Sequence, residues 1–219
     1  MMTKDWKSLR EARALVIGHD PALQKSDTQA GFALFADYYF KPEPSSRSER
    51  RKYGLAKSTF DQISFLTNDS IKPEEIYITN LCNDKLPHAP VKKTVFIPKS
   101  KAEEGIKHIK EILLSNPSIK YIFPMSLQVN YWLQKLGFYQ GSQEFVDSSE
   151  PSKAGMNSNP PYYTPRKGIT FLMICGNCYR VSAGNQIVFP ILHSKNYPLK
   201  GRFFAYSDRY DKIREYFRI

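Results

Sequence analysis

Short apolar runs rich in β-branched residues alternate along this sequence with longer stretches of helical periodicity, and this alternation restricts the fold more than any other feature. The apolar runs that we expect to form strands are residues 13–17, 76–79, 120–123, 169–174 and 187–192. Apolar residues recur at helical spacing in between, at 103–114 and 127–136. Strands that alternate with helices are typical of a mostly parallel sheet that helices cover on both faces. The sequence therefore predicts an α/β fold, a three-layer α/β/α sandwich with a central, mostly parallel sheet.

Residues 142–168 interrupt this alternation, because they are rich in Ser, Pro, Asn and Gly. Apolar patterning resumes directly afterwards, so we expect a long surface loop at about 142–168 inside a single domain that spans residues 1–219. No apolar run approaches the roughly 18 residues of a membrane-spanning helix, and the first residues lack the apolar stretch of a signal peptide. We therefore expect a monomer in the cytoplasm that has no membrane partner.

The three cysteines include a pair, Cys175 and Cys178, with the Cys-x-x-Cys spacing of zinc and iron–sulfur sites. Such sites normally need four ligands; Cys82 is the only other cysteine of the chain, and His88, near Cys82 in the sequence, could be a fourth ligand. Cys175 also lies inside an apolar strand pattern, where alternate side chains point into the core. We interpret all three as reduced, structural cysteines and expect neither a metal nor a cofactor.

The positive charge of the chain is concentrated in two segments. The formal net charge is +11, and residues 41–57 and 195–219 each contribute a net +4. A charge run is often only a solvated helical surface, and clustering by itself does not establish a polyanionic partner. The clustering becomes informative if both segments flank one site, where they would contact phosphates.

Two groups of aromatic residues invite a base-stacking interpretation. They are Tyr38-Tyr39-Phe40 and Tyr131-Trp132. Aromatic residues at such spacings are more often part of the core, and we assign both groups there.

Polar residues follow three of the predicted strands. Gly18-His19-Asp20-Pro21 follows the first, Asn80 ends the second and His193 ends the last. In an open α/β sheet, ligands bind outside the carboxyl ends of the strands. There Asp20 could act as a general base, Asn80 could read the edge of a base, and His193 could donate to a developing oxyanion. Each residue also has a structural interpretation, as a turn residue or as a partly buried histidine.

Taken together, these motifs resemble those of the uracil-DNA glycosylases. Gly18-His19-Asp20-Pro21 resembles the Gly-Gln-Asp-Pro motif with which that family activates water. In the family a Gln-Ala pair follows, and the Phe that stacks on uracil comes five residues after the Ala; here Gln29-Ala30 is followed by Phe35 at that spacing. Thr79-Asn80 is similar to the segment whose Asn hydrogen-bonds uracil. His193 matches the His of the family's His-Pro-Ser-Pro-Leu motif.

The resemblance runs from Leu15 to about Phe204, and it implies an enzyme that flips a base out of DNA and hydrolyses its N-glycosidic bond. Phe35 would then stack on the base, and Asn80 would read its Watson–Crick edge, with His19 also binding the base. Asp20 would position water or stabilise the positively charged sugar. His193 would hydrogen-bond the departing base at the oxygen where negative charge grows.

The resemblance also implies contacts with DNA from both basic segments. Tyr197 falls where the family places a Leu wedge that fills the hole left by the base, and an aromatic ring could fill that space too. Lysine and arginine side chains would contact phosphates and make the affinity depend on salt. The residues that we expect to contact DNA are Arg47, Arg50, Arg51, Lys195, Tyr197, Lys200 and Arg202.

The sequence also departs from the family pattern. His19 replaces Gln, Ala22-Leu23 replaces Tyr-His, and Ser194-Lys195-Asn196 replaces Pro-Ser-Pro. The missing Tyr is the residue that screens out the methyl group of thymine. We therefore expect a DNA glycosylase-like protein that acts on a flipped uracil or another aberrant base. The alternatives are a non-catalytic nucleic-acid-binding relative with the same fold, and a small-molecule hydrolase on a similar open sheet.

Overall fold

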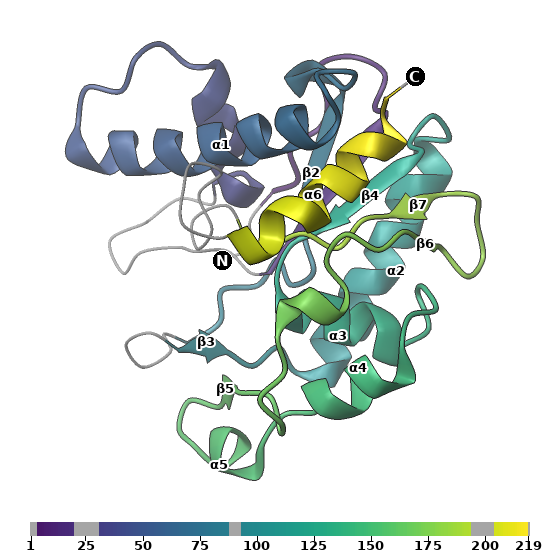
Figure 1. Cartoon of the computed structure of the whole chain (residues 1–219). Helices are drawn as coiled ribbons and strands as arrows, with labels where there is room; N and C mark the ends of the chain where they lie inside the picture. Colours follow the sequence, from purple (N-terminus) through teal and green to yellow (C-terminus); the bar gives the residue numbers. More distant parts are fainter. Residues whose placement is uncertain (1–3, 20–30, 88–92, 194–203, 219) are drawn as a thin grey trace.

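The computed structural model describes residues 4–19, 31–87, 93–193 and 204–218 of the chain (Figure 1). In this part of the chain a five-stranded sheet forms the centre, with the strand order β2-β1-β4-β7-β6. The strands are β1 (Ala14–Gly18), β2 (Ile76–Asn80), β4 (Tyr121–Pro124), β6 (Tyr179–Arg180) and β7 (Ile187–Val188). The first four strands in this order are parallel, and β6 is antiparallel to β7.

Helices cover both faces of this sheet (Figure 1). On one face lie α1 (Arg47–Leu66), α6 (Phe204–Tyr216) and the 3-10 helix η1 (Ala33–Phe40); on the other lie α2 (Lys99–Ser115) and α3 (Leu127–Lys135). Every residue of β1 and β2 is buried, as expected for strands between two helical layers. None of the helices in the described residues is long and apolar enough to cross a bilayer. The predicted α/β/α sandwich with a mostly parallel sheet is confirmed.

Local signals in the sequence explain where α1 begins and which face it buries. The Ser46 hydroxyl accepts the backbone N–H of Glu49, and the Glu49 carboxylate accepts the N–H of Ser46, both at 3.1 Å. This reciprocal pair is a capping box, and its hydrogen bonds lower the pKa of Glu49. Further along, Ala56, Phe60 and Ile63 recur at helical spacing and are buried.

Residues 169–174 do not form the predicted strand. They contain the 3-10 helix η3 (Phe171–Met173), and both Phe171 and Ile174 are buried. The strand that pairs with β7 comes later, as β6, after Gly176 turns the chain with φ +78°. A short apolar run reports burial and does not distinguish a strand from another buried segment, which is why this prediction is wrong.

The last predicted strand, residues 187–192, is regular only over β7. Beyond β7, the N–H groups of Phe189 and Ile191 still donate to carbonyls of β4 at 2.8 and 3.1 Å. Pro190 lies between them and has no N–H to donate. The chain therefore follows β4 to its carboxyl end, although the regular strand stops at Val188.

Residues 142–168 contain regular structure where the sequence predicts a long surface loop. The elements are α4 (Gln143–Ser149), α5 (Lys153–Met156) and β5 (Tyr162–Tyr163), which pairs antiparallel with β3 (Thr94–Val95). The hydroxyls of Ser142 and Ser152 cap the two helices, accepting backbone N–H groups at 3.4 and 3.3 Å. Serine favours helix caps as well as loops, so the Ser-rich composition marks two helix starts here.

Candidate functional site

The order of the parallel strands creates a topological switch at β1. The chain passes from β1 to β2 on one side of it and then to β4 on the other side (Figure 1). In open α/β sheets, ligands bind in the crevice outside the carboxyl ends of the strands at such a switch. Gly18 is paired with Asn80 at this end, and one step further Met125 is paired with Ile191. We call this end of the sheet the carboxyl edge, and the predicted site residues that it carries in the described residues are His19, Asn80 and His193.

Gly18 is required at the carboxyl edge because the Asn80 side chain occupies the space beside it. A Cβ atom on Gly18 would overlap Oδ1 of Asn80 and would lie 3.3 Å from Cδ2 of Leu34. Asn80 is only 1% exposed and Leu34 is also buried. The lack of a side chain at Gly18 therefore lets the Asn80 amide and the segment that carries Phe35 approach the end of β1.

Phe35 lies outside the buried core, and its ring turns toward α1. Leu34 and Phe35 both have left-handed backbone conformations, with φ of 51° and 54°. Such a conformation costs a non-glycine residue about 1–3 kcal/mol, so the surrounding packing must hold it. The Phe35 ring lies edge-on to Tyr38, with Nζ of Lys52 5.4 Å from its centroid. The structure therefore brings Leu34, rather than Phe35, against Gly18.

His19 is buried, and the Gln128 side chain of α3 fixes how it can hydrogen-bond. Oε1 of Gln128 accepts the N–H of Ile97 at 2.6 Å, and Nε2 donates to the carbonyl of Val95 at 2.9 Å. These two bonds set the orientation of the amide, whose NH₂ group lies 2.5 Å from Nε2 of His19. Nε2 of His19 must therefore accept, so the hydrogen of the neutral ring lies on Nδ1.

His193 follows the extension of β7 and is half-buried. The carbonyl of Leu192, directly before it, accepts a hydrogen bond from Nε2 of Gln62 at 3.1 Å. The same Gln62 amide donates to the hydroxyl of Tyr210 in α6 at 3.3 Å. Gln62 therefore joins α1 and α6 to the chain that carries His193 at the carboxyl edge.

The two basic segments differ in the structure. Arg47, Arg50 and Arg51 are exposed near the start of α1 and have no ion pair within the described residues. In α6 three basic residues are matched by three acidic ones, and Arg214 pairs with Asp211 at 3.2 Å. The surplus of the second segment therefore lies mainly before α6, in the stretch that follows His193. The predicted site residues outside the described residues are Asp20, Lys195, Tyr197, Lys200 and Arg202.

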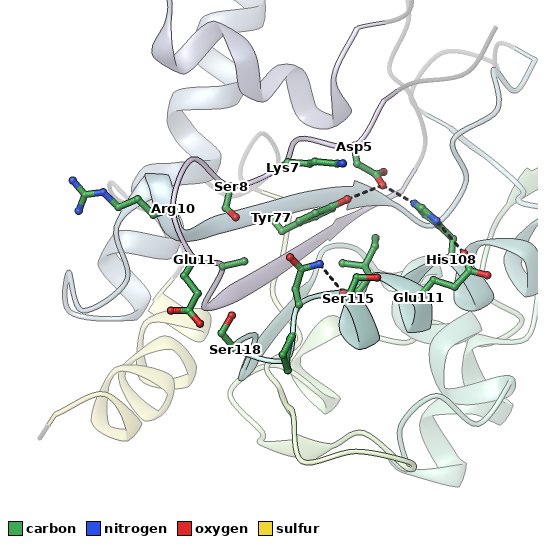
Figure 2. Close-up of a pocket in the computed structure, with 14 residues that line it drawn as sticks. Asp5, Lys7, Ser8, Arg10, Glu11, Tyr77, His108, Glu111, Ser115 and Ser118 are labelled. Carbon is green, nitrogen blue, oxygen red and sulfur yellow. Dashed lines mark hydrogen bonds and ion pairs between the residues drawn. The ribbon is translucent and has the colours of Figure 1, made fainter.

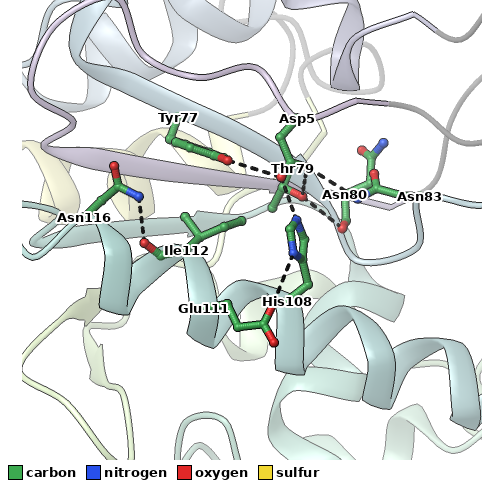
Figure 3. A network of polar contacts seen from close by, with 9 residues as sticks. All are labelled: Asp5, Tyr77, Thr79, Asn80, Asn83, His108, Glu111, Ile112 and Asn116. Atoms are coloured by element: carbon green, nitrogen blue, oxygen red, sulfur yellow. Dashed lines mark hydrogen bonds and ion pairs between the residues drawn. The ribbon is translucent and has the colours of Figure 1, made fainter.

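A second polar group, which we call the Asp5 cluster, lies on the α2 side of β2 (Figure 3). It consists of Asp5, Tyr77, Thr79 and His108. The hydroxyls of Thr79 and Tyr77 donate to the Asp5 carboxylate at 2.7 and 3.2 Å. Nε2 of His108 lies 2.6 Å from the same carboxylate, and the Asp5 side chain is 12% exposed. One nearly buried carboxylate thus ties the N-terminal segment to β2 and α2.

The Asp5 cluster closes one end of a pocket of about 730 Å³ (Figure 2). The N-terminal segment lines this pocket with residues that include Lys7 and Glu11. The end of α2 lines it with residues that include Ser115. Burial and the charge of Asp5 raise the pKa of Tyr77, so its hydroxyl stays protonated and remains a donor. The donors of the cluster are directed at Asp5, as the dashed lines of Figure 2 show.

The cysteines are free, with Cys82 and Cys175 buried and Cys178 exposed. Burial raises the pKa of the Cys175 thiol to about 12, which keeps it protonated and unreactive. In the described ranges, no three His, Cys, Asp or Glu side chains gather in a way that could hold a metal ion. Cys175 therefore behaves as a residue of the core.

Several residues that shape these sites carry no local signal in the sequence. Gln62 and Gln128 contact partners that lie 130 and 109 residues away in the chain, and Asp5 meets His108 across 103 residues. Tyr38, which aromatic spacing assigns to the core, lies outside it, whereas the neighbouring Tyr39 and Phe40 pack against the core.

The sequence matches no protein-family model, and comparison with curated proteins finds no similar sequence. The likeness to the uracil-DNA glycosylases therefore rests on the short motifs themselves.

Proposed function

We propose that the protein is a DNA glycosylase-like enzyme that flips uracil or another aberrant base out of DNA and hydrolyses its N-glycosidic bond. One observation carries the proposal: Gly18 lets the Asn80 amide pack directly against the end of β1, at the topological switch. His19 and His193 follow the same edge of the sheet. The proposal is supported by the described residues Gly18, His19, Asn80 and His193, which follow or end strands at the carboxyl edge.

In this proposal the bond between C1′ of the sugar and the base nitrogen breaks, and water adds to C1′. Asp20 positions the water, accepts its proton and stabilises the positive charge on the sugar. The base leaves with the electrons of the broken bond, and His193 donates a hydrogen bond to the oxygen where this charge grows. Stabilisation of a developing oxyanion is usually the largest single contribution to such catalysis.

The same proposal assigns recognition of the base to Asn80 and His19, and contact with DNA to the arginines of α1. Positively charged side chains near the site attract DNA and make the affinity for DNA depend on salt. The proposed partner is DNA, and the proposed form is a cytoplasmic monomer that needs no cofactor.

The second candidate is a non-catalytic relative that binds nucleic acid. The burial of Asn80 favours it, because a side chain that is 1% exposed must first be uncovered before it can read a base. The replacement of Gln by His19, whose Nε2 is already engaged by Gln128, favours it as well.

The decisive experiment measures base release from oligonucleotides that contain uracil, hypoxanthine or xanthine, in single and double strands. We expect release of at least one base, and loss of that release in Asp20→Asn. Lys110→Ala, on the exposed side of α2, is the matched control and should act like the wild type. Salt-dependent binding without release from any substrate would select the second candidate. Absence of binding even at low salt would remove both.

A further inference from the structure

Another pocket lies at the opposite end of the sheet from the carboxyl edge. Two of the residues that line it are Arg13, which directly precedes β1, and Tyr121, the first residue of β4. Because β1 and β4 are parallel, both residues lie where the strands begin, and we call this end of the sheet the amino edge. The pocket has a volume of about 650 Å³, which is within the range of pockets that take small molecules.

Aromatic rings form one side of the amino-edge pocket. Tyr216 and Phe217, at the end of α6, have ring centroids 6.2 and 4.8 Å from that of Tyr121. The rings meet edge to face, at interplanar angles of 80° and 63°, so they line the pocket as adjoining walls and do not form a flat stack. Tyr216 is 43% exposed. Aromatic surface is therefore accessible at this pocket.

Asn68 fixes the end of α6 that carries these rings. Its amide nitrogen donates to the carbonyl of Arg214 at 2.8 Å, and its amide oxygen accepts Nε–H of Arg214 at 3.1 Å. The Phe217 ring also packs against Phe189 of the core, with centroids 5.7 Å apart. The walls of the pocket are therefore formed before a ligand binds, which lowers the entropic cost of binding.

Two arginines supply the positive charge of the pocket. Nη1 of Arg13 donates to the carbonyl of Ser70 at 2.7 Å and lies 3.6 Å from the Glu75 carboxylate. Arg218 is exposed, and its side chain has no ion pair or hydrogen bond in the part of the chain that the structure describes. A guanidinium group carries five N–H donors. Both arginines therefore have donors left for an anionic ligand.

The balance of charge favours a ligand with one negative charge. Of the described residues that line the pocket, Arg13 and Arg218 are the charged ones, and Glu75 offsets the charge of Arg13. One positive charge is left unbalanced, which suits a carboxylate better than a phosphate with its nearly two negative charges at neutral pH. Guanidinium groups also bind planar carboxylates through two parallel hydrogen bonds. A carboxylate attached to an aromatic ring therefore matches both the arginines and the aromatic walls.

We propose that the amino-edge pocket binds an aromatic carboxylate, a flat apolar ring system that carries one negative charge. The ring system packs against Tyr216 and Phe217, and the carboxylate pairs with Arg218 and with the remaining donors of Arg13. The pocket differs in this respect from the Asp5 cluster, whose donors already pair with a carboxylate of the protein. Binding at the amino edge does not depend on the proposed release of a base, because that reaction is proposed at the other end of the strands.

Isothermal titration calorimetry of the full chain with naphthoate tests the proposal. Naphthamide has the same rings without the charge, and decahydronaphthoate has the charge and the carbon skeleton without aromatic rings. We expect naphthoate to bind about tenfold more tightly than naphthamide, because the amide lacks charge-assisted hydrogen bonds. It should bind about fivefold more tightly than decahydronaphthoate, which lacks edge-to-face contacts, and more tightly than inorganic phosphate.

Variants of the chain separate the contribution of charge from that of the aromatic walls. Arg218→Gln should weaken the binding of naphthoate about tenfold and leave that of naphthamide unchanged, because it removes only the charged partner. Tyr216→Ala should weaken the binding of both compounds. Tyr216→Phe, which keeps the ring, should bind both like the wild type.

Arg47 offers a matched control at the other end of α1. It is exposed, and the 20 residues of α1 span about 30 Å, so Arg47 lies far from Asn68, which follows this helix at the pocket. Arg47→Gln should bind naphthoate like the wild type. Thermal unfolding of each variant shows that the comparison is made between folded proteins.

The proposal is wrong if the wild type does not bind naphthoate at millimolar concentration, or if naphthamide, decahydronaphthoate or phosphate binds as tightly. It is also wrong if Arg218→Gln and Arg47→Gln bind naphthoate equally. Failure of the proposed chemistry looks different. If the wild type releases no base from DNA but binds naphthoate in a way that depends on Arg218, the glycosylase reaction is lost and the amino-edge site stands.

Discussion

The carboxyl edge and the Asp5 cluster share strand β2, but their polar groups are arranged in opposite ways. Thr79 and Asn80 are neighbours, yet successive side chains of a strand point to opposite faces. Thr79 therefore donates to Asp5 (Figure 3), while the Asn80 side chain packs against Gly18. In the Asp5 cluster, donors from β2 and α2 converge on one carboxylate. At the carboxyl edge, polar residues end different strands around a glycine.

This difference shows that a pocket with polar residues is not sufficient evidence for chemistry. The Asp5 cluster adjoins a pocket of about 730 Å³, but its donors all pair with the Asp5 carboxylate and link three segments of the chain. The carboxyl edge instead has features that stability alone does not require, such as the left-handed pair Leu34 and Phe35. We therefore propose a structural role for the Asp5 cluster, and the proposed function stays with the carboxyl edge.

The largest expected effect is on the rate of base release, and it appears when one histidine in each of the two regions is replaced by alanine. His193→Ala should lower the rate of base release about 1000-fold, because it removes the donor to the departing base. His108→Ala should leave the rate per folded molecule unchanged and lower the free energy of unfolding by about 1 kcal/mol. Single-turnover kinetics and denaturant unfolding of both variants provide the comparison. Equal effects on the rate would contradict the assignment of roles.

The next effect concerns the space beside Gly18. Gly18→Ala should lower the free energy of unfolding by about 3 kcal/mol, because the added methyl group overlaps the Asn80 amide. Gly54→Ala is the control, since a Cβ there meets no atom within 4 Å in the middle of α1. It should raise stability by about 0.5–1 kcal/mol, as alanine does in exposed helices. If Gly18→Ala is as stable as the wild type, the close packing of Asn80 is wrong.

A smaller loss is expected at the centre of the Asp5 cluster. Asp5→Asn should lower the free energy of unfolding by about 2 kcal/mol, since hydrogen bonds from Tyr77, Thr79 and His108 lose their carboxylate acceptor. Base release per folded molecule should not change. A variant that is fully stable but inactive would show that Asp5 takes part in the reaction.

The smallest effect is expected for Thr79→Val, which keeps the shape of the side chain and removes its hydroxyl. It should cost about 1 kcal/mol, the usual net contribution of one hydrogen bond. Because Thr79 is adjacent to Asn80, this variant tests whether a change on the Asp5 side of β2 affects base release at the carboxyl edge. A large loss of base release with a small loss of stability would show that it does.

The sequence predicts the parts of this molecule that depend on local patterns. The sequence points to Gly18 and Asn80 as candidates because each stands at the end of an apolar run. Parallel strands bring their carboxyl ends to one edge of a sheet, and Gly18 is paired with Asn80 there. The face of α1 that packs on the sheet follows from helical spacing in the same way.

Interactions between distant segments are beyond such patterns. Nothing near His19 in the sequence points to Gln128, and nothing near Asp5 points to His108. Tyr38 lies outside the core although the next two residues pack against it. No residue type predicts the left-handed backbone of Leu34 and Phe35. The apolar run 169–174 packs into the core without pairing in the sheet, because burial alone does not create a strand partner.

The most direct test of the central assignment uses the four histidines of the chain, His19, His88, His108 and His193. Their imidazole signals can be followed by NMR while a uracil-containing single strand is added to the Asp20→Asn variant, which should bind without cleaving. The account predicts that the signals of His19 and His193 shift on binding and that the signal of His108 does not. A shift of His108 with His193 unchanged would contradict it and would move the binding site to the Asp5 cluster.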